Sequence, residues 1–263
     1  MSRPAKSGEN MREQRLPIIF AREEELEELK KRLQARQSFL FHGPAGVGKT
    51  LLLQCAIGDG KDILYSSQNH SPQILYRNLA RALLSLRNPV LVGACGNKPA
   101  ALQDKTFVAI KGLVQDTLRS SRFVVVLDHL ACPSQGLASS IRDLMVGLGV
   151  PVVTVARSVH MEDVGFVLPL FPDRSERLAL CNFVPETARR FATTVAQDEG
   201  VTAENLGQFL DRVVEYSDGN AGAIVQMIRM GKAPKYIHDN HIKITPLYLD
   251  YRIATVAQET WTH

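Results

Sequence analysis

Between residues 17 and 183 the chain alternates short apolar runs with longer segments of mixed polarity. Five of the runs have the length of buried strands, and they lie at 39–41, 62–66, 123–128, 151–158 and 177–183. Before the first run, a helix with acidic residues in its first turn is predicted to continue to about residue 36. Between the runs, helices are predicted at about 49–57, 72–86, 107–119 and 134–147. This alternation predicts an α/β fold, a three-layer core around a mostly parallel sheet of five strands.

Two stretches of this region lack a clear period. Residues 87–104 are interrupted by glycines and prolines, which predicts mostly loop. Residues 162–176 contain two prolines and are expected to be irregular.

The pattern changes at residue 184, beyond which helical segments follow one another. They are predicted at about 185–197, 203–216 and 221–230, with a last helix that starts at Pro246 and has Thr245 as its N-cap. We therefore expect three parts: a disordered basic arm over 1–16, an α/β domain over 17–183 and a small helical lid subdomain over 184–263.

The composition is that of a water-soluble globular protein, with 45% hydrophobic and 22% charged residues. No apolar run is long enough to span a bilayer and the N-terminus is polar, so we expect a cytoplasmic protein without membrane contact. The four cysteines lack metal-ligand spacing, which favours reduced thiols. The net charge of +4 permits nucleic-acid binding without favouring it.

The strongest motif lies between the first predicted strand and the second predicted helix. Residues 43–50 read GPAGVGKT, a complete G-x-x-x-x-G-K-T phosphate-binding loop in strand–loop–helix context. Its glycines let backbone N–H groups surround phosphate oxygens, and the helix N-terminus is positive at the same place. We expect Lys49 to reach the β- and γ-phosphates of a nucleoside triphosphate and Thr50 to bind Mg²⁺.

A second candidate lies about eighty residues further on. Asp128 closes the apolar run at 123–128, and the carboxyl end of a parallel strand is where open α/β sheets place their ligands. We expect Asp128 to hold Mg²⁺ opposite Thr50. At the end of the next strand, Thr154, Arg157 and Ser158 are candidates to sense the γ-phosphate, with an ordinary strand end as the alternative.

Together these motifs resemble the AAA+ class of P-loop ATPases, and within it the branch of signal-transducing (STAND), origin-recognition-like and transposition ATPases. Residues 20–26, FAREEEL, are similar to the "GRE" segment that helps hold adenine in that branch. Residues 154–157 are similar to its "T-x-R" strand end, and 219–222 to its "GNP" lid motif. The resemblance covers roughly residues 18–230, and of its motifs the phosphate-binding loop alone is specific.

The resemblance implies ATP or ADP and Mg²⁺ as ligands. It also implies the nucleotide-binding residues, which are Phe20, Arg22, Gly43, Pro44, Ala45, Gly46, Val47, Gly48, Lys49, Thr50 and Leu51. The implied catalytic residues are Lys49, Asp128, His129 and Arg157.

Two departures from the AAA+ pattern predict slow hydrolysis. His129 stands where these enzymes carry a glutamate that polarises the attacking water, and Gly222 stands where many carry a second sensor arginine. Both changes remove charge that stabilises phosphoryl transfer. A nucleotide-dependent switch is therefore favoured over an ATPase with fast turnover.

Partners follow from the resemblance too. A homo-oligomer in the ATP state is implied, with an arginine finger at Arg174 or Arg177, although a solvated basic loop is the simpler interpretation of that pair. The short chain implies a protein effector on a separate chain. The alternative function is an ATPase that assembles on duplex DNA and recruits a transposase, nuclease or replication factor. A small-molecule kinase fits less well, since no acceptor-binding motif is present.

Overall fold

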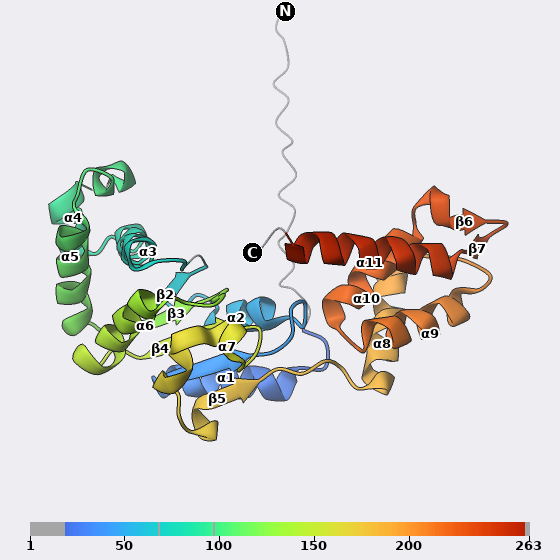
Figure 1. The fold of residues 1–263 in the computed structure, drawn as a ribbon, viewed down its shortest axis with the longest axis horizontal. Coiled ribbons are helices and arrows are strands. Elements are labelled where there is room, and N and C mark those ends of the chain that lie inside the picture. Colours follow the sequence, from blue (N-terminus) through green and yellow to red (C-terminus); the bar gives the residue numbers. More distant parts are fainter. Residues whose placement is uncertain (1–18, 68, 97, 261–263) are drawn as a thin grey trace, which may run out of the picture.

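A parallel sheet of five strands forms the centre of the larger half of the molecule (Figure 1). The computed structural model describes residues 19–67, 69–96 and 98–260, so the arm predicted over 1–16 lies outside it. The strands are β1 (Phe39–His42), β2 (Ile63–Ser66), β3 (Val124–Leu127), β4 (Val152–Ala156) and β5 (Arg177–Ala179). Their order is β2-β3-β4-β1-β5 and every neighbouring pair is parallel, which confirms the predicted α/β class.

Alternating side chains of the strands supply two separate apolar layers. In β1, Phe39 and Phe41 are buried against α1 (Glu23–Gln34) and α2 (Lys49–Ile57). Leu40 points to the other face. That face is covered by α3 (Pro72–Ser85), α5 (Phe107–Arg119) and α6 (Gln135–Arg142), the last of which continues as the π-helical turn η2 (Asp143–Gly147). The result is the predicted three-layer core.

The prediction of loop over 87–104 is wrong. The segment forms α4 (Pro89–Cys95) and the 3-10 turn η1 (Pro99–Leu102). Asn88 caps α4 by accepting hydrogen bonds from the N–H groups of residues 90 and 91, and Gly96 ends it in the left-handed conformation. Two of its side chains, Leu91 and Cys95, are buried, so packing outweighs the poor helix propensity of glycine here.

The segment predicted to be irregular contains three short helical turns. They are α7 (Met161–Val164), η3 (Gly165–Leu170) and η4 (Arg174–Glu176). The strand predicted over 177–183 ends at Ala179, because pairing with β1 stops at the start of the phosphate-binding loop.

The C-terminal region is helical and has its own core. It contains α8 (Pro185–Asp198), α9 (Leu206–Ser217), α10 (Ala221–Gly231) and α11 (Ile244–Thr260), with the short turn η5 (Pro234–Tyr236) and a hairpin of β6 (Ile237–His238) and β7 (His241–Ile242) between the last two. Because α11 begins at Ile244, Thr245 lies inside its first turn and is not the predicted N-cap.

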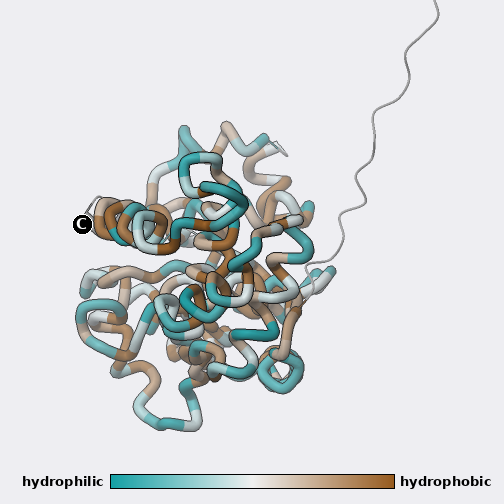
Figure 2. Tube along the Cα trace, turned by 90° about the vertical axis from the view of Figure 1, so that its right-hand side faces the viewer, coloured by the Kyte–Doolittle hydropathy of each residue, from teal (hydrophilic) through white to brown (hydrophobic). Residues whose placement is uncertain are grey.

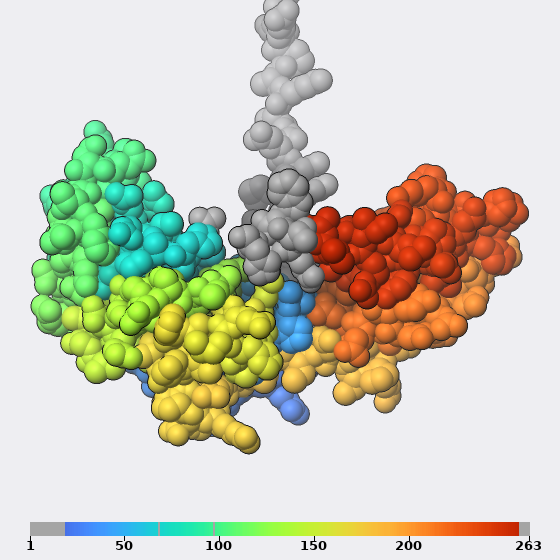
Figure 3. Space-filling model, in the orientation of Figure 1, coloured from blue at the N-terminus to red at the C-terminus, as the bar shows by residue number. Residues whose placement is uncertain are grey.

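This helical region stands beside the α/β region, as the orange and red atoms of Figure 3 show. Phe20, which precedes α1, packs against the core of the helical region. This contact joins the helical region to the α/β region. Seen from that side, the helix next to the C-terminus, α11, carries both hydrophobic and hydrophilic positions (Figure 2). Within the described part of the chain, no helix has the length and apolar character needed to cross a membrane.

Candidate nucleotide-binding site

The phosphate-binding loop, residues 43–48, connects β1 directly to α2, as predicted. Gly46 and Gly48 have φ angles of +77° and +103°, which side chains with a Cβ atom rarely adopt. A Cβ atom on Gly46 would also lie 2.8 Å from Oδ1 of Asn220. The loop therefore needs glycine both for its turn and for the close approach of another segment.

The backbone donors of this loop suit a phosphate group. Among the described residues, no group accepts a hydrogen bond from the N–H of Ala45, Gly46 or Gly48. Unpaired donors at the N-terminus of a helix are the usual surroundings of a bound phosphate. The chain thus fits the ligand that the motif implies.

Lys49 lies at the first position of α2 with its ammonium group folded over the loop. Its Nζ donates hydrogen bonds to the carbonyl oxygens of Gly43 and Pro44, at 2.6 and 2.9 Å. Burial lowers the pKa of Lys49 to about 8, an effect that the Asp128 carboxylate opposes and the Arg157 guanidinium reinforces. Lys49 is therefore still charged at pH 7, although its surroundings stabilise that charge less well than water does.

The side chains of Thr50 and Asp128 meet at the carboxyl edge of the sheet. The Thr50 hydroxyl donates to Oδ2 of Asp128 at 2.8 Å, and the aspartate is only 1% exposed. Oδ1 accepts a hydrogen bond from the His129 N–H at 2.8 Å. A hydroxyl and a carboxylate at this spacing are oxygen ligands of the kind that Mg²⁺ prefers.

Tyr65 is a site residue that sequence reasoning missed. Its hydroxyl donates to Oδ2 of Asp128 at 2.6 Å. A tyrosine within a strand looks like any other residue of that strand, so the sequence carries no signal for this contact. The pairing of β2 with β3 could have suggested it once the strand order was known.

His129 lies beside this carboxylate and faces solvent. Its Nδ1 is 3.3 Å from Oδ2 of Asp128, and its side chain is 63% exposed. The residue has a φ of +56°, a conformation that histidine tolerates better than most residues. The imidazole is thus close to the predicted Mg²⁺ ligand.

Phe20 and Arg22 line a small cavity next to the phosphate-binding loop, with a volume of about 70 Å³. Phe20 packs against Phe183 and Phe191, with ring centroids 6.3 and 5.3 Å away. The Arg22 guanidinium stacks on Phe183 at 4.3 Å and bonds Glu25 at 2.7 Å. The sequence did not single out Phe183 and Phe191, because they lie in the helical region far along the chain.

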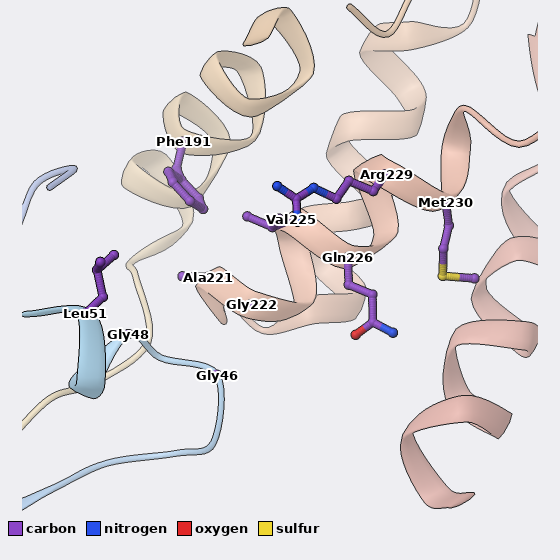
Figure 4. A pocket seen from close by; sticks show the side chains of 10 residues that line it. All are labelled: Gly46, Gly48, Leu51, Phe191, Ala221, Gly222, Val225, Gln226, Arg229 and Met230. Carbon is purple, nitrogen blue, oxygen red and sulfur yellow. The ribbon is translucent and has the colours of Figure 1, made fainter. Parts of the chain in front are cut away.

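A larger cavity of about 590 Å³ adjoins this one and shares four of its lining residues, which are Gly48, Leu51, Phe191 and Ala221. Figure 4 shows Phe191 and Leu51 on one side of it and the length of α10 on the other. The phosphate-binding loop and the helical region therefore line a common open cleft whose volume is large enough for a small ligand.

The N-terminus of α10 rests on the phosphate-binding loop. The Asn220 side chain donates to the carbonyl oxygen of Ala45 at 2.8 Å, and the Gly222 N–H donates to that of Gly46 at 2.9 Å. A Cβ atom on Gly222 would lie 2.9 Å from the Gly46 oxygen, so a side chain there would push the two apart. Gly222 is thus a point of backbone contact.

The predicted γ-phosphate sensors occupy different surroundings. Thr154 is fully buried, and its hydroxyl has no hydrogen-bond partner among the described residues. Arg157 is exposed and close enough to lower the pKa of Lys49. Ser158 accepts a hydrogen bond from the His160 N–H at 2.9 Å. Within the described part of the chain, Arg157 is the one residue of these three that affects the pKa of Lys49.

The two arginine-finger candidates, Arg174 and Arg177, differ in their hydrogen bonds. Arg177 donates to the carbonyl oxygens of Phe171 and Pro172, at 2.9 and 3.1 Å, and so is bound to its own loop. Arg174 is exposed, and its guanidinium bonds to no group in the described part of the chain. Of these two arginines, Arg174 is therefore the one available to another molecule.

No protein-family model matches the sequence, and no curated protein sequence is detectably similar to it. Among solved structures, the Walker-type ATPase Paby2304 of Pyrococcus abyssi matches 93% of this chain and 75% of its own, with a TM-score of 0.60 and 16% identity. The fold is that of a Walker-type, P-loop ATPase.

Two structures of the RuvB Holliday junction branch migration motor of Thermotoga maritima, one of them a mutant, also match at 16% identity. They align with 88% and 87% of this chain and 69% and 65% of their own, at TM-scores of 0.48 and 0.47. TM-scores at that level support no conclusion about the branch of P-loop ATPases or about activity. The fold places the phosphate-binding loop and Asp128 at the carboxyl edge of the sheet. Any conclusion about function must therefore rest on the residues of the site.

Proposed function

We propose that this chain binds ATP or ADP with Mg²⁺ between its α/β and helical regions, hydrolyses ATP slowly, and acts as a nucleotide-dependent switch. The observation that carries the proposal is the hydrogen bond between Thr50 and Asp128, at 2.8 Å. It lies beside a glycine loop in which three N–H donors find no acceptor among the described residues. One motif places the hydroxyl and another, 78 residues away, places the carboxylate.

In this proposal the loop N–H groups and Lys49 hold the phosphates. Lys49 exchanges its two carbonyl partners for phosphate oxygens, which are stronger acceptors because they are charged. Thr50 and Asp128 hold Mg²⁺, which neutralises phosphate charge when bound. Each of these residues lies at the carboxyl edge of the sheet, where P-loop proteins bind phosphates.

The base side of the nucleotide is assigned to the cavity near Phe20 and Arg22 together with the adjoining larger cavity, because about 70 Å³ alone is too small for a purine. The walls of the smaller cavity are apolar apart from Arg22, and they include Leu51 of α2 and Phe191 of α8. A ring inserted there contacts both regions of the molecule. The helical region therefore senses whether nucleotide is present.

Slow hydrolysis is expected from the two residues that replace charged groups of AAA+ enzymes, His129 and Gly222. His129 has no fixed negative charge, so it orients an attacking water less strongly than the glutamate of AAA+ enzymes does. Gly222 contributes only its backbone. Arg229, further along α10, donates to Glu199 at 2.7 Å and is held within the helical region.

The switch has a structural basis in the contact between α10 and the loop. Asn220 and Gly222 bond to the same loop whose N–H groups are assigned to phosphate. A change in loop conformation on phosphate binding therefore moves the start of α10. The angle between the two regions is the quantity that the nucleotide is proposed to set.

Calorimetric titration of ATP tests the proposal, with Mg²⁺ and with EDTA. We expect tight binding that Mg²⁺ strengthens, loss of binding in Lys49→Ala, and loss of the Mg²⁺ effect in Asp128→Asn. Lys61→Ala, which removes an exposed lysine ahead of β2, is the matched control and must bind as the unmodified chain does. Absence of ATP and ADP binding in the unmodified chain would refute the proposal, as would steady-state turnover above about one per second.

A further inference from the structure

A tyrosine outside the sequence motifs reaches the carboxylate that the proposed function assigns to Mg²⁺. Tyr65 is the third residue of β2, and it is aligned with Val126 of the parallel strand β3. Side chains alternate along a strand, so Tyr65 and Val126 share the face of the sheet that packs against α2. Asp128 lies two residues beyond Val126, and Thr50 belongs to α2. The topology therefore brings tyrosine, aspartate and threonine together.

The contact is short and involves a charged acceptor. The Tyr65 hydroxyl is 2.6 Å from Oδ2 of Asp128, a distance typical of a hydroxyl that donates to a carboxylate. The same oxygen accepts the Thr50 hydroxyl, and the other accepts the His129 N–H. Three donors thus fix the rotation of one buried carboxylate.

We propose that Tyr65 is a positioning residue for Mg²⁺, one that holds the Asp128 carboxylate in the orientation that the ion requires. The proposal rests on the proposed function, since it concerns the same metal. Thr50 is itself an assigned ligand and belongs to the helix that follows the phosphate-binding loop. Tyr65 belongs to the sheet, so it holds the carboxylate before the ion arrives and while it is bound.

The test compares how strongly Mg²⁺ improves ATP affinity in several variants of the full chain. Calorimetric titrations in Mg²⁺ and in EDTA give that ratio. We expect Tyr65→Phe to lower the ratio about tenfold or more, because loss of an outer partner of a metal ligand typically costs about 10- to 100-fold in metal affinity. ATP affinity in EDTA must stay unchanged, since Tyr65 has no assigned contact with the nucleotide.

The matched control is Tyr76→Phe. Tyr76 is fully buried, whereas Tyr65 is half-buried, and the Tyr76 hydroxyl is bonded to Gln115 at 3.4 Å on the other face of the sheet. Its removal must leave the ratio as it is. Tyr65→Leu is a second variant, which removes the same hydroxyl with different packing and must show the same loss.

The outcomes separate this inference from the proposed function. If the unmodified chain shows no Mg²⁺ effect, the proposed function fails. If it shows one, and either folded Tyr65 variant keeps it within about twofold, the positioning inference alone is overturned. A fall in EDTA affinity equal to the fall in Mg²⁺ would also overturn it, because that result indicates general damage to the site.

Discussion

At the scale of single residues, the site depends on a lysine whose charge is poorly solvated. Burial lowers the pKa of Lys49 to about 8. Phosphate binding favours the ammonium form, so above about pH 8 binding must take up a proton and affinity falls by up to about tenfold per pH unit. Below that pH the lysine is already charged, and its contribution is constant.

This predicts a break in ATP affinity near pH 8, measured by titration between about pH 7 and pH 9.5. Lys49→Arg is the control, because a guanidinium stays charged throughout and its curve must lack the break. Parallel curves for the two proteins would show that the lysine does not titrate in this range.

His129 gives a second prediction at this scale. Replacement by glutamate places a fixed carboxylate where AAA+ enzymes have one, and general bases typically contribute about 10²- to 10⁴-fold to rate. We expect His129→Glu to raise steady-state ATP turnover at least about tenfold, measured by phosphate release. His129→Gln, which provides no base, must not exceed the unmodified chain. Equal turnover in all three proteins would contradict the explanation given for slow hydrolysis.

At the scale of elements, Asn220 links α10 to the phosphate-binding loop. Its side chain accepts the N–H of Ala223 as the helix cap and donates to the Ala45 carbonyl. Asn220→Ala removes both bonds, and loss of a cap alone costs about 1 kcal/mol of stability. Asn88→Ala is matched, since Asn88 caps α4 in the same way, away from the loop.

We expect both substitutions to lower the free energy of unfolding to a similar extent, measured in urea. Only Asn220→Ala should weaken the change in proteolysis pattern that ATP produces between the two regions, because only Asn220 contacts the loop. An ATP response that is the same in both variants would remove the role assigned to this contact.

The elements were predictable where one signal dominated. The bounds of α2 and α5 agree with the expected 49–57 and 107–119, since each has a clear start and stop in the sequence. α4 was missed because its glycines resemble a loop, whereas burial of Leu91 and Cys95 and the Asn88 cap stabilise a helix.

Within the site, the sequence indicates residues that belong to a contiguous motif or close a strand. Lys49, Thr50 and Asp128 are of this kind. Tyr65, Phe191 and Asn220 contact the site through pairing and packing between distant segments, which no local pattern records. Thr154 shows the converse, because the strand-end motif does not indicate that its hydroxyl is buried and lacks a hydrogen-bond partner among the described residues.

At the scale of the whole molecule, Arg174 is the arginine-finger candidate that is exposed and so available to a second copy. We expect Arg174→Ala to lose ATP-dependent assembly, followed by sedimentation velocity, while ATP affinity is retained. Arg177→Ala is the comparison, because that side chain is bound to its own loop. Unchanged assembly in Arg174→Ala would exclude it as an arginine finger.

The central claim is that bound nucleotide sets the angle between the α/β and helical regions. Small-angle X-ray scattering of the full chain, without nucleotide, with ADP and with Mg²⁺-ATP, measures this most directly, with Lys49→Ala as the control. We predict that the scattering profile changes on addition of Mg²⁺-ATP, in shape or in mass, and that Lys49→Ala shows no change. Identical profiles of the unmodified chain in all three conditions, with ATP binding established, would contradict the account.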